Sequence, residues 1–130
     1  WHLFSRKAKE SRQEANVLIQ TIDAQNFAKS MASSAGLLCS AGFEGPSEAL
    51  FLGKKLFVVP VKGQYEQYCN ASSLKQLGVP TTSKINDDSL MKLRDWVRNE
   101  QTIKLDFPNQ TRDILEAEIF APDKFHLITK

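Results

Sequence analysis

Three short apolar runs follow one another along the first half of the chain. They occupy residues 17–19, 36–39 and 55–60. Each run is rich in β-branched or aliphatic residues and nearly continuous, which is typical of strands that are covered on both faces of a parallel sheet. They recur about every 20 residues, so each interval has room for one helix. The spacing predicts strand–helix–strand units and therefore an α/β fold.

The segments after these runs have helical patterns. Residues 25–33 carry apolar side chains four positions apart, and residues 46–52 begin with Pro46 in a first helical turn, preceded by Gly45 as the expected N-cap. Residues 64–77 form a third expected helix. Its expected buried side comprises Tyr68, Cys69, Ala71, Leu74 and Leu77. Strands and helices thus alternate, and we expect a Rossmann-like parallel sheet flanked by helices.

The flanking segments have weaker patterns. Residues 89–99 are expected to form a helix with N-cap residues at 86–88. Its expected buried stripe comprises Leu90, Leu93, Trp96 and Val97. The remaining expectations are the end of a strand at 1–5, a polar surface helix or loop at 7–15, an extended piece at 79–85, a weak strand or linker at 103–107, and a last helix at 111–120.

Composition describes one ordinary globular domain over residues 1–130. The chain has 42% hydrophobic and 25% charged residues, which excludes a disordered chain. Seventeen Lys plus Arg residues face fifteen Asp plus Glu residues, a net charge of +2. So small a surplus predicts no nucleic-acid partner. No apolar run reaches the length that spans a membrane, so no transmembrane segment is expected.

Cysteine and histidine are scarce, and their positions predict no metal site. Cys39 and Cys69 form no CxxC pair and lie near no cluster of histidines, so both are expected to be buried free thiols. His2 and His126 are expected at the surface or at an edge, away from the chemistry. Asp87 and the acidic residue after it fit a helix cap better than a metal-binding motif.

The loop after the second apolar run has the features of a diphosphate site. A strand is expected to end at Ser40, and a glycine-containing loop then leads into a helix near Pro46. The first amides of such a helix are free, and the helix dipole favours an anion there. Gly42 would let a ligand approach the backbone closely, and Glu48 could accept hydrogen bonds from two ribose hydroxyls. Simpler interpretations stay open: the glycines could only shape a turn, and Glu48 could cap the helix.

The stretch 40–71 resembles the donor-binding half of GT-B glycosyltransferases. The likeness is to the group that contains the peptidoglycan N-acetylglucosaminyltransferase and, more distantly, to the UDP-glycosyltransferases. Gly42 and Glu48 have the family's separation, Pro60 matches a family proline, and residues 66–71 fit the pattern acid-Gln-x-x-Asn-Ala. Three positions differ: Ser40 stands where the eukaryotic pattern has histidine, Gly45 replaces a serine or threonine, and Lys55 replaces a proline.

The resemblance implies roles for individual residues. Gly42, Phe43, Glu44 and Gly45 would hold the donor diphosphate, Glu48 would bind the ribose, and Gln64, Glu66, Gln67 and Asn70 would lie at the donor sugar. The loop around Ile22 matches, weakly, the place where the family's backbone contacts the base. With Gly45 lacking a hydroxyl, the diphosphate would depend more on backbone amides.

The resemblance also implies the setting of the domain. The chain is expected to be a truncated C-terminal domain, because it starts at Trp1 and contains no acceptor half. Its partners would be a nucleotide-diphosphate sugar, taken as a substrate, and an N-terminal domain of the same polypeptide that supplies the catalytic base. No cofactor and no metal are implied. The family places the full enzyme in the cytoplasm, with peripheral association at the inner face of the membrane as an option.

Two alternative functions remain at this point. The non-hydrolysing UDP-sugar 2-epimerases share the fold and use acidic residues from both domains. A degenerate, non-catalytic domain kept for protein interactions is the other alternative, and the three departures from the family pattern are consistent with it. The expected function is that of the donor-binding domain of a glycosyltransferase, acting on a nucleotide-diphosphate sugar such as a UDP-sugar, with the residues 1–130 inactive on their own.

Overall fold

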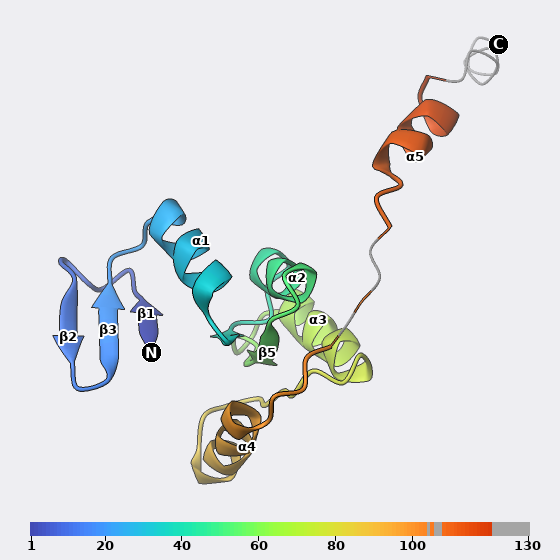
Figure 1. The fold of residues 1–130 in the computed structure, drawn as a ribbon. Helices are drawn as coiled ribbons and strands as arrows, with labels where there is room; N and C mark the ends of the chain where they lie inside the picture. Colours follow the sequence, from blue (N-terminus) through green and yellow to red (C-terminus); the bar gives the residue numbers. More distant parts are fainter. Residues whose placement is uncertain (104, 106–107, 121–130) are drawn as a thin grey trace.

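The computed structural model describes residues 1–103, 105 and 108–120 (Figure 1). Three strands come first, strands and helices then alternate up to the fifth strand, and the remaining described elements are helices. The elements in order are β1 (His2–Phe4), β2 (Arg12–Glu14), β3 (Val17–Gln20), α1 (Ala24–Ser33), β4 (Gly36–Cys39), α2 (Glu44–Phe51), β5 (Lys55–Val58), α3 (Tyr65–Gln76), α4 (Asp87–Arg98) and α5 (Thr111–Glu118). The expected α/β class, with a small parallel sheet flanked by helices, is confirmed.

The strands form two small sheets among the described residues. In the first, β1 and β2 lie on either side of β3, with β1 parallel and β2 antiparallel to it. In the second, β4 and β5 pair in parallel, from Gly36 opposite Lys55 to Cys39 opposite Val58. The three apolar runs are therefore all strands, as expected, but the first belongs to a different sheet from the other two.

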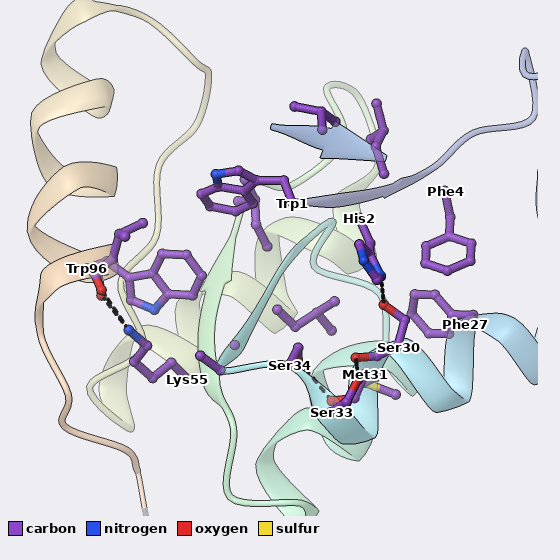
Figure 2. Close-up of a pocket in the computed structure, with 17 residues that line it drawn as sticks. Trp1, His2, Phe4, Phe27, Ser30, Met31, Ser33, Ser34, Lys55 and Trp96 are labelled. Atoms are coloured by element: carbon purple, nitrogen blue, oxygen red, sulfur yellow. Dashed lines mark hydrogen bonds between the residues drawn. The ribbon is translucent and has the colours of Figure 1, made fainter. Parts of the chain in front are cut away.

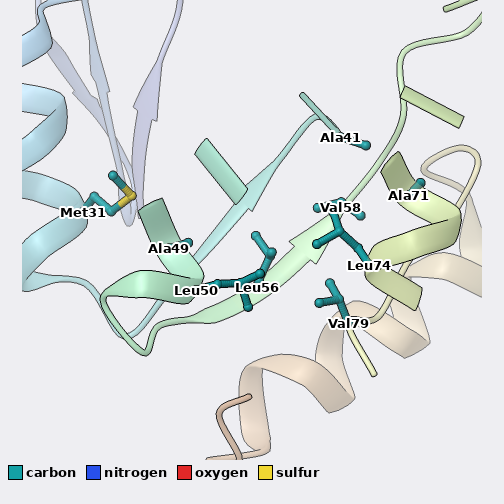
Figure 3. Close-up of a cluster of buried hydrophobic side chains, with 9 residues drawn as sticks. All are labelled: Met31, Ala41, Ala49, Leu50, Leu56, Val58, Ala71, Leu74 and Val79. Carbon is teal, nitrogen blue, oxygen red and sulfur yellow. The ribbon is translucent and has the colours of Figure 1, made fainter. Parts of the chain in front are cut away.

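The core is built around β5. Leu56, Phe57 and Val58 are buried, and consecutive residues of a strand point to opposite faces, so β5 is covered on both. The cluster on one face consists of Met31, Ala41, Ala49, Leu50, Leu56, Val58, Ala71, Leu74 and Val79 (Figure 3). On the other face Phe57 packs edge-to-face against Trp96, with ring centroids 5.7 Å apart. Each large apolar side chain buried in this way contributes roughly 1.5–3 kcal/mol.

The segment 7–15, expected to be a polar surface helix or loop, contains a strand. Its residues Arg12–Glu14 pair with β3 through a tight turn in which Ala15 has a φ of 49°. The strand is exposed throughout, and its polar sequence has no apolar alternation to indicate a strand. Pairing with β3 outweighs the local sequence here, because the β3 edge supplies the hydrogen-bonding partners.

Helix α2 begins two residues earlier than expected. Phe43, rather than Gly45, is the N-cap, and Pro46 is the third helical residue. Proline is still compatible with this position, because the first-turn amides of a helix have no partner within the helix. Helix α4 also starts early, at Asp87, where Asn86 and Ser89 form a reciprocal capping box.

Two helical faces are less buried than the sequence predicts. On α3, Ala71 and Leu74 are buried, but Tyr68, Cys69 and Leu77 are exposed. On α4, Trp96 is buried, but Leu90 and Val97 are exposed. The prediction that all of these residues face the core was therefore wrong. Each of these two helices therefore buries only some of its apolar side chains in the described core.

The end of α4 is held by Lys55. Its Nζ donates to the main-chain oxygens of Val97 and Asn99, both at 2.9 Å, and to that of Trp96 at 3.3 Å. A cation at this place satisfies carbonyls that have no partner within the helix and is favoured by the helix dipole. Lys55 stands where the resemblance expects proline, and it supplies this contact.

The C-terminal segments are only partly described. A strand or linker was expected at residues 103–107. Ile103 and Leu105 pack against the core cluster, and residues 104, 106 and 107 lie outside the described residues. Helix α5 confirms the last expected helix. His126 also lies outside the described part. Among the described helices, none is long and apolar enough to cross a membrane.

Substituting Gly36 tests how tightly β4 is packed. A β-carbon at this position would lie 2.8 Å from the main-chain oxygen of Lys55 and 3.0 Å from the Trp96 ring. We expect Gly36→Ala to lower the free energy of unfolding in urea by about 1–3 kcal/mol, because the backbone oxygen has little freedom to move. Gly42→Ala is the matched control, since a β-carbon there meets nothing within 4 Å, and its effect should stay within about 0.5 kcal/mol. Equal effects of the two substitutions would contradict this packing.

The two thiols should differ in reactivity. Burial raises the pKa of Cys39 to about 12, so this thiol stays protonated and unreactive in the folded protein, whereas Cys69 is exposed. In a thiol titration with Ellman's reagent at pH 8, we expect one thiol to react rapidly (the fast thiol) in the folded chain and both thiols to react rapidly in denaturant. Cys69→Ser should remove the fast thiol, and Cys39→Ser should leave it. Two fast thiols in the folded chain would show that Cys39 is accessible.

Candidate functional site

Two loops meet at the C-terminal ends of β4 and β5. The first loop, residues 40–43, leads into α2, and the second, residues 59–64, leads into α3. Because β4 and β5 are parallel, both loops leave the same edge of their sheet, where ligands bind in open α/β folds. A direct contact joins them: the Asn70 side-chain amide on α3 donates to the Ala41 oxygen at 3.1 Å. We call this region, residues 40–48 and 59–70, the two-loop edge.

The first loop presents free backbone amides. Within the described part of the chain, the N–H groups of residues 42–45 have no hydrogen-bond partner. The Phe43 oxygen, in contrast, accepts from both the backbone N–H and the hydroxyl of Ser47, which fixes the start of α2. Free amides at a helix N-terminus form an anion-binding arrangement. Phe43 and Glu44 are exposed, and Gly42 and Gly45 are half-buried.

Neither the backbone conformation nor the packing requires a glycine at position 42. Its φ is not positive, and a β-carbon built on it would meet nothing within 4 Å. A role in shaping the turn therefore does not explain this glycine. Gly45 differs, because a β-carbon there would touch Leu37 and Cys39 at ordinary contact distances of 3.7 and 4.0 Å. Gly45 thus faces β4, and only its amide belongs to the loop surface.

Glu48 does not cap its helix. It lies beyond the first turn, because α2 starts at Glu44, and α2 has no side-chain capping bond. The carboxylate is exposed and makes no hydrogen bond or ion pair with the described residues. The alternative that Glu48 serves as a capping residue is therefore not supported, and the carboxylate is available to a ligand.

The second loop is held by its own side chains. Gln67 accepts from the Val61 amide at 2.9 Å and donates to Gln64 at 2.7 Å. Gly63, with a φ of 83°, donates its N–H to the Tyr68 hydroxyl at 3.1 Å. Sequence reasoning assigned Tyr68 to the core and missed this contact. Tyrosine has a hydroxyl group as well as an apolar ring, and Tyr68 lies one helical turn after the glycine-containing loop. These two features of the sequence could have indicated the contact with the loop.

Glu66 and Asn70 lie together at the start of α3. Their side chains approach to 3.5 Å, with the Asn70 amide directed at Glu66 as well as at Ala41. Glu66 is exposed and Asn70 is half-buried. Asn70 therefore joins the two loops, and Glu66 remains open to a ligand beside it.

Ile22 lies apart from these residues in the fold. It follows β3, in the other sheet, and is 59% exposed. Helix α1 begins after it at Ala24, and the carboxylate of the N-cap residue Asp23 accepts from the Asn26 amide at 2.7 Å. The structure thus brings together the expected diphosphate and sugar residues, and no described contact links Ile22 or Glu48 to the second loop.

Two cavities lie near these elements. One of about 530 Å³ separates α2 from α3, is mainly apolar, and includes Gly42, Phe43 and Asn70 in its lining. A larger one of about 770 Å³ lies between the two sheets and contains none of the expected donor-site residues (Figure 2). The two-loop edge is therefore an open surface at one end of the smaller cavity.

No group of three or more metal-ligating side chains occurs among the described residues. His2 lies on β1 and forms a hydrogen bond of 2.7 Å with the Ser30 hydroxyl, which confirms its expected place at an edge. Tyr65, in the first turn of α3, is exposed, and a hydrogen bond with Cys69 raises its pKa. Tyr65 and Cys69 therefore lie within the two-loop edge, and His2 lies outside it.

Comparison with known proteins identifies the family. The family described as glycosyl transferase family 1 matches residues 3–100, which include both loops and helices α1 to α4. No curated protein and no solved structure matches the chain significantly. The match supports glycosyl transfer in general, and it does not favour the epimerase alternative. The chain, with its α/β fold and its two loops at one sheet edge, belongs to glycosyl transferase family 1.

Proposed function

We propose that the chain binds the donor of a glycosyltransferase, a nucleotide-diphosphate sugar and most specifically a UDP-sugar, at the two-loop edge. One observation carries this proposal. Within the described part of the chain, the N–H groups of residues 42–45 have no hydrogen-bond partner, and the exposed carboxylate of Glu48 on α2 makes no hydrogen bond or ion pair. An anion site next to a hydroxyl acceptor suits a diphosphate joined to a ribose.

The diphosphate would be held mainly by the backbone. The four consecutive N–H groups of residues 42–45 lie at the start of α2, where the positive end of the helix dipole is, and none belongs to a side chain. These groups are in place before the ligand binds, so they would stabilise the charge that develops on the leaving diphosphate without reorganisation. The family pattern has a serine or threonine where this chain has Gly45. The loss of that hydroxyl is consistent with binding through the backbone, because a β-carbon at Gly45 would face Leu37 and Cys39 of the sheet.

The ribose and the sugar would be bound on either side of the diphosphate. Glu48 lies three positions after Gly45, about 4.5 Å along the helix, within the reach of a ribose attached to the phosphates. At the sugar, Glu66 would accept hydrogen bonds from hydroxyl groups. Gln67 already uses both ends of its amide within the loop, so it would act with Gln64 chiefly to position that loop. Asn70 would hold the two loops together.

Three further parts of this proposal concern the rest of the reaction. The backbone near Ile22 would contact the base from the neighbouring sheet. The catalytic base that deprotonates the acceptor is assigned to a second domain, and no described residue is given that role. We therefore expect these 130 residues to bind the donor without transferring its sugar, and to need no metal or cofactor for binding.

Glu48 provides the sharpest test of donor binding. Calorimetric titration should detect UDP binding at concentrations up to about 5 mM, and Glu48→Gln should raise the UDP Kd roughly ten- to hundred-fold through loss of charge-assisted hydrogen bonds. The 2′,3′-dideoxy form of UDP lacks the partners of Glu48, so its Kd should be the same for the original chain and for Glu48→Gln.

Glu44→Gln is the matched control for that experiment. It removes the same charge from the same helix but keeps the backbone amide, so UDP should bind equally well or more tightly. Equal losses for UDP and its dideoxy form in Glu48→Gln would refute a ribose contact. No UDP binding by the original chain would refute the donor site as a whole.

A further inference from the structure

Glu44 places a carboxylate at the start of α2, among the free amides of the first loop. It is the first residue of the helix, it is exposed, and its own N–H is one of the four without a partner. Side chains of a helix tilt toward its N-terminus, so this carboxylate is displaced toward the first loop. It makes no hydrogen bond or ion pair with the described residues, so no neighbouring cation neutralises it.

The rest of the two-loop edge does not compensate this charge. Residues 40–48 and 59–70 contain three carboxylates, those of Glu44, Glu48 and Glu66, and a single cation, Lys62. The two ion pairs found among the described residues both lie elsewhere. Phosphate sites commonly use arginine or lysine. A diphosphate at this edge would instead be held by neutral N–H groups in negative surroundings, so its affinity should fall as its own charge rises.

Sugar transfer changes the charge of the ligand at this place. In a nucleotide-diphosphate sugar, each of the two phosphates carries one negative charge. On transfer, the bond between the anomeric carbon and the terminal phosphate oxygen breaks, and the electron pair stays on that oxygen. The acceptor oxygen bonds to the sugar, and its proton goes to the base of the second domain. The terminal phosphate of the product then carries nearly two negative charges above a pKa of about 6.

We propose that Glu44 is a specificity-determining residue, which lowers the affinity of the two-loop edge for the nucleoside diphosphate product more than for the nucleotide-sugar donor; this role rests on the proposed function of the site. The repulsion grows with the charge that the product gains. The N–H groups act at hydrogen-bond distance and Glu44 acts through solvent, so Glu44 weakens binding without preventing it. Product release limits the rate of many enzymes, and Glu44 would favour that step.

Two ligands that differ in the charge of the terminal phosphate test this role. They are UDP and the methyl ester of UDP on its terminal phosphate, which has the charge of the donor without a sugar. Titrations followed by ¹H–¹⁵N spectra at pH 8 and about 30 mM ionic strength give both Kd values. A unit charge roughly 7 Å away in water changes a Kd about three-fold. We expect Glu44→Gln to lower both Kd values, and that of UDP about three-fold more than that of the ester.

Two control variants separate the charge of Glu44 from other effects. Glu44→Asp keeps the charge and should retain most of the original selectivity. Glu10→Gln removes the same charge from a segment before β2, in the other sheet, and should leave the ratio of the two Kd values unchanged. Glu44 also stabilises α2 through the helix dipole. A purely structural role would lower the Tm of Glu44→Gln, measured by circular dichroism, without changing that ratio.

Three results would overturn this role. The first is an equal change in the Kd values of UDP and its ester in Glu44→Gln, which would leave the donor site standing because both ligands still bind. The second is a change in selectivity that persists in about 0.5 M salt, where repulsion through solvent is screened. The third is the absence of binding of both ligands to the original chain, which would refute the donor site as well.

Discussion

The parallel pairing of β4 with β5 is the interaction on which the rest of the structure depends. Leu56, Phe57 and Val58 are buried on β5, and α2 packs against both strands. Because the two strands run in the same direction, their loops leave the sheet side by side, and Asn70 can reach the Ala41 oxygen. The same pairing leaves the other edge of β4 without a partner strand among the described residues. A change that shifted this register would therefore disturb the core and the two-loop edge together.

The two-loop edge is largely a backbone site. Its amides are aligned by the start of α2, and the side chains of Ser47, Gln67 and Tyr68 are used to hold the loops rather than to face a ligand. Such a site would tolerate the differences from the family pattern at Ser40 and Gly45, because the amides proposed to bind the diphosphate do not depend on these side chains. This is why we interpret the differences as variation within a glycosyltransferase rather than as loss of function.

The sequence predicted the parts of the fold that depend on continuous apolar burial. The strands β3, β4 and β5 were predicted from their apolar runs, but the expected burial on both faces holds only for β5. Strands β3 and β4 are mostly half-buried, because the described elements cover them only in part. Strand β2 was missed because its stability comes from the β3 edge and not from its own polar residues. The exposure of Cys69, and of Leu77 at the end of α3, could not be predicted either, because helical periodicity gives a face but not how much of it neighbouring elements cover.

For the candidate site, the residues themselves indicated Gly42 and Glu48, and the resemblance to the family implied Glu66 and Asn70. The contacts that bring the loops together came only from the three-dimensional arrangement. The central claim is that UDP binds to the amides of the first loop. The most direct measurement is a ¹H–¹⁵N correlation spectrum of the labelled chain recorded during a UDP titration. The account predicts that the largest shifts occur at the amides of residues 42–45 and at the side-chain amide of Asn70. Shifts confined to residues outside the two-loop edge, with residues 42–45 unchanged, would contradict it.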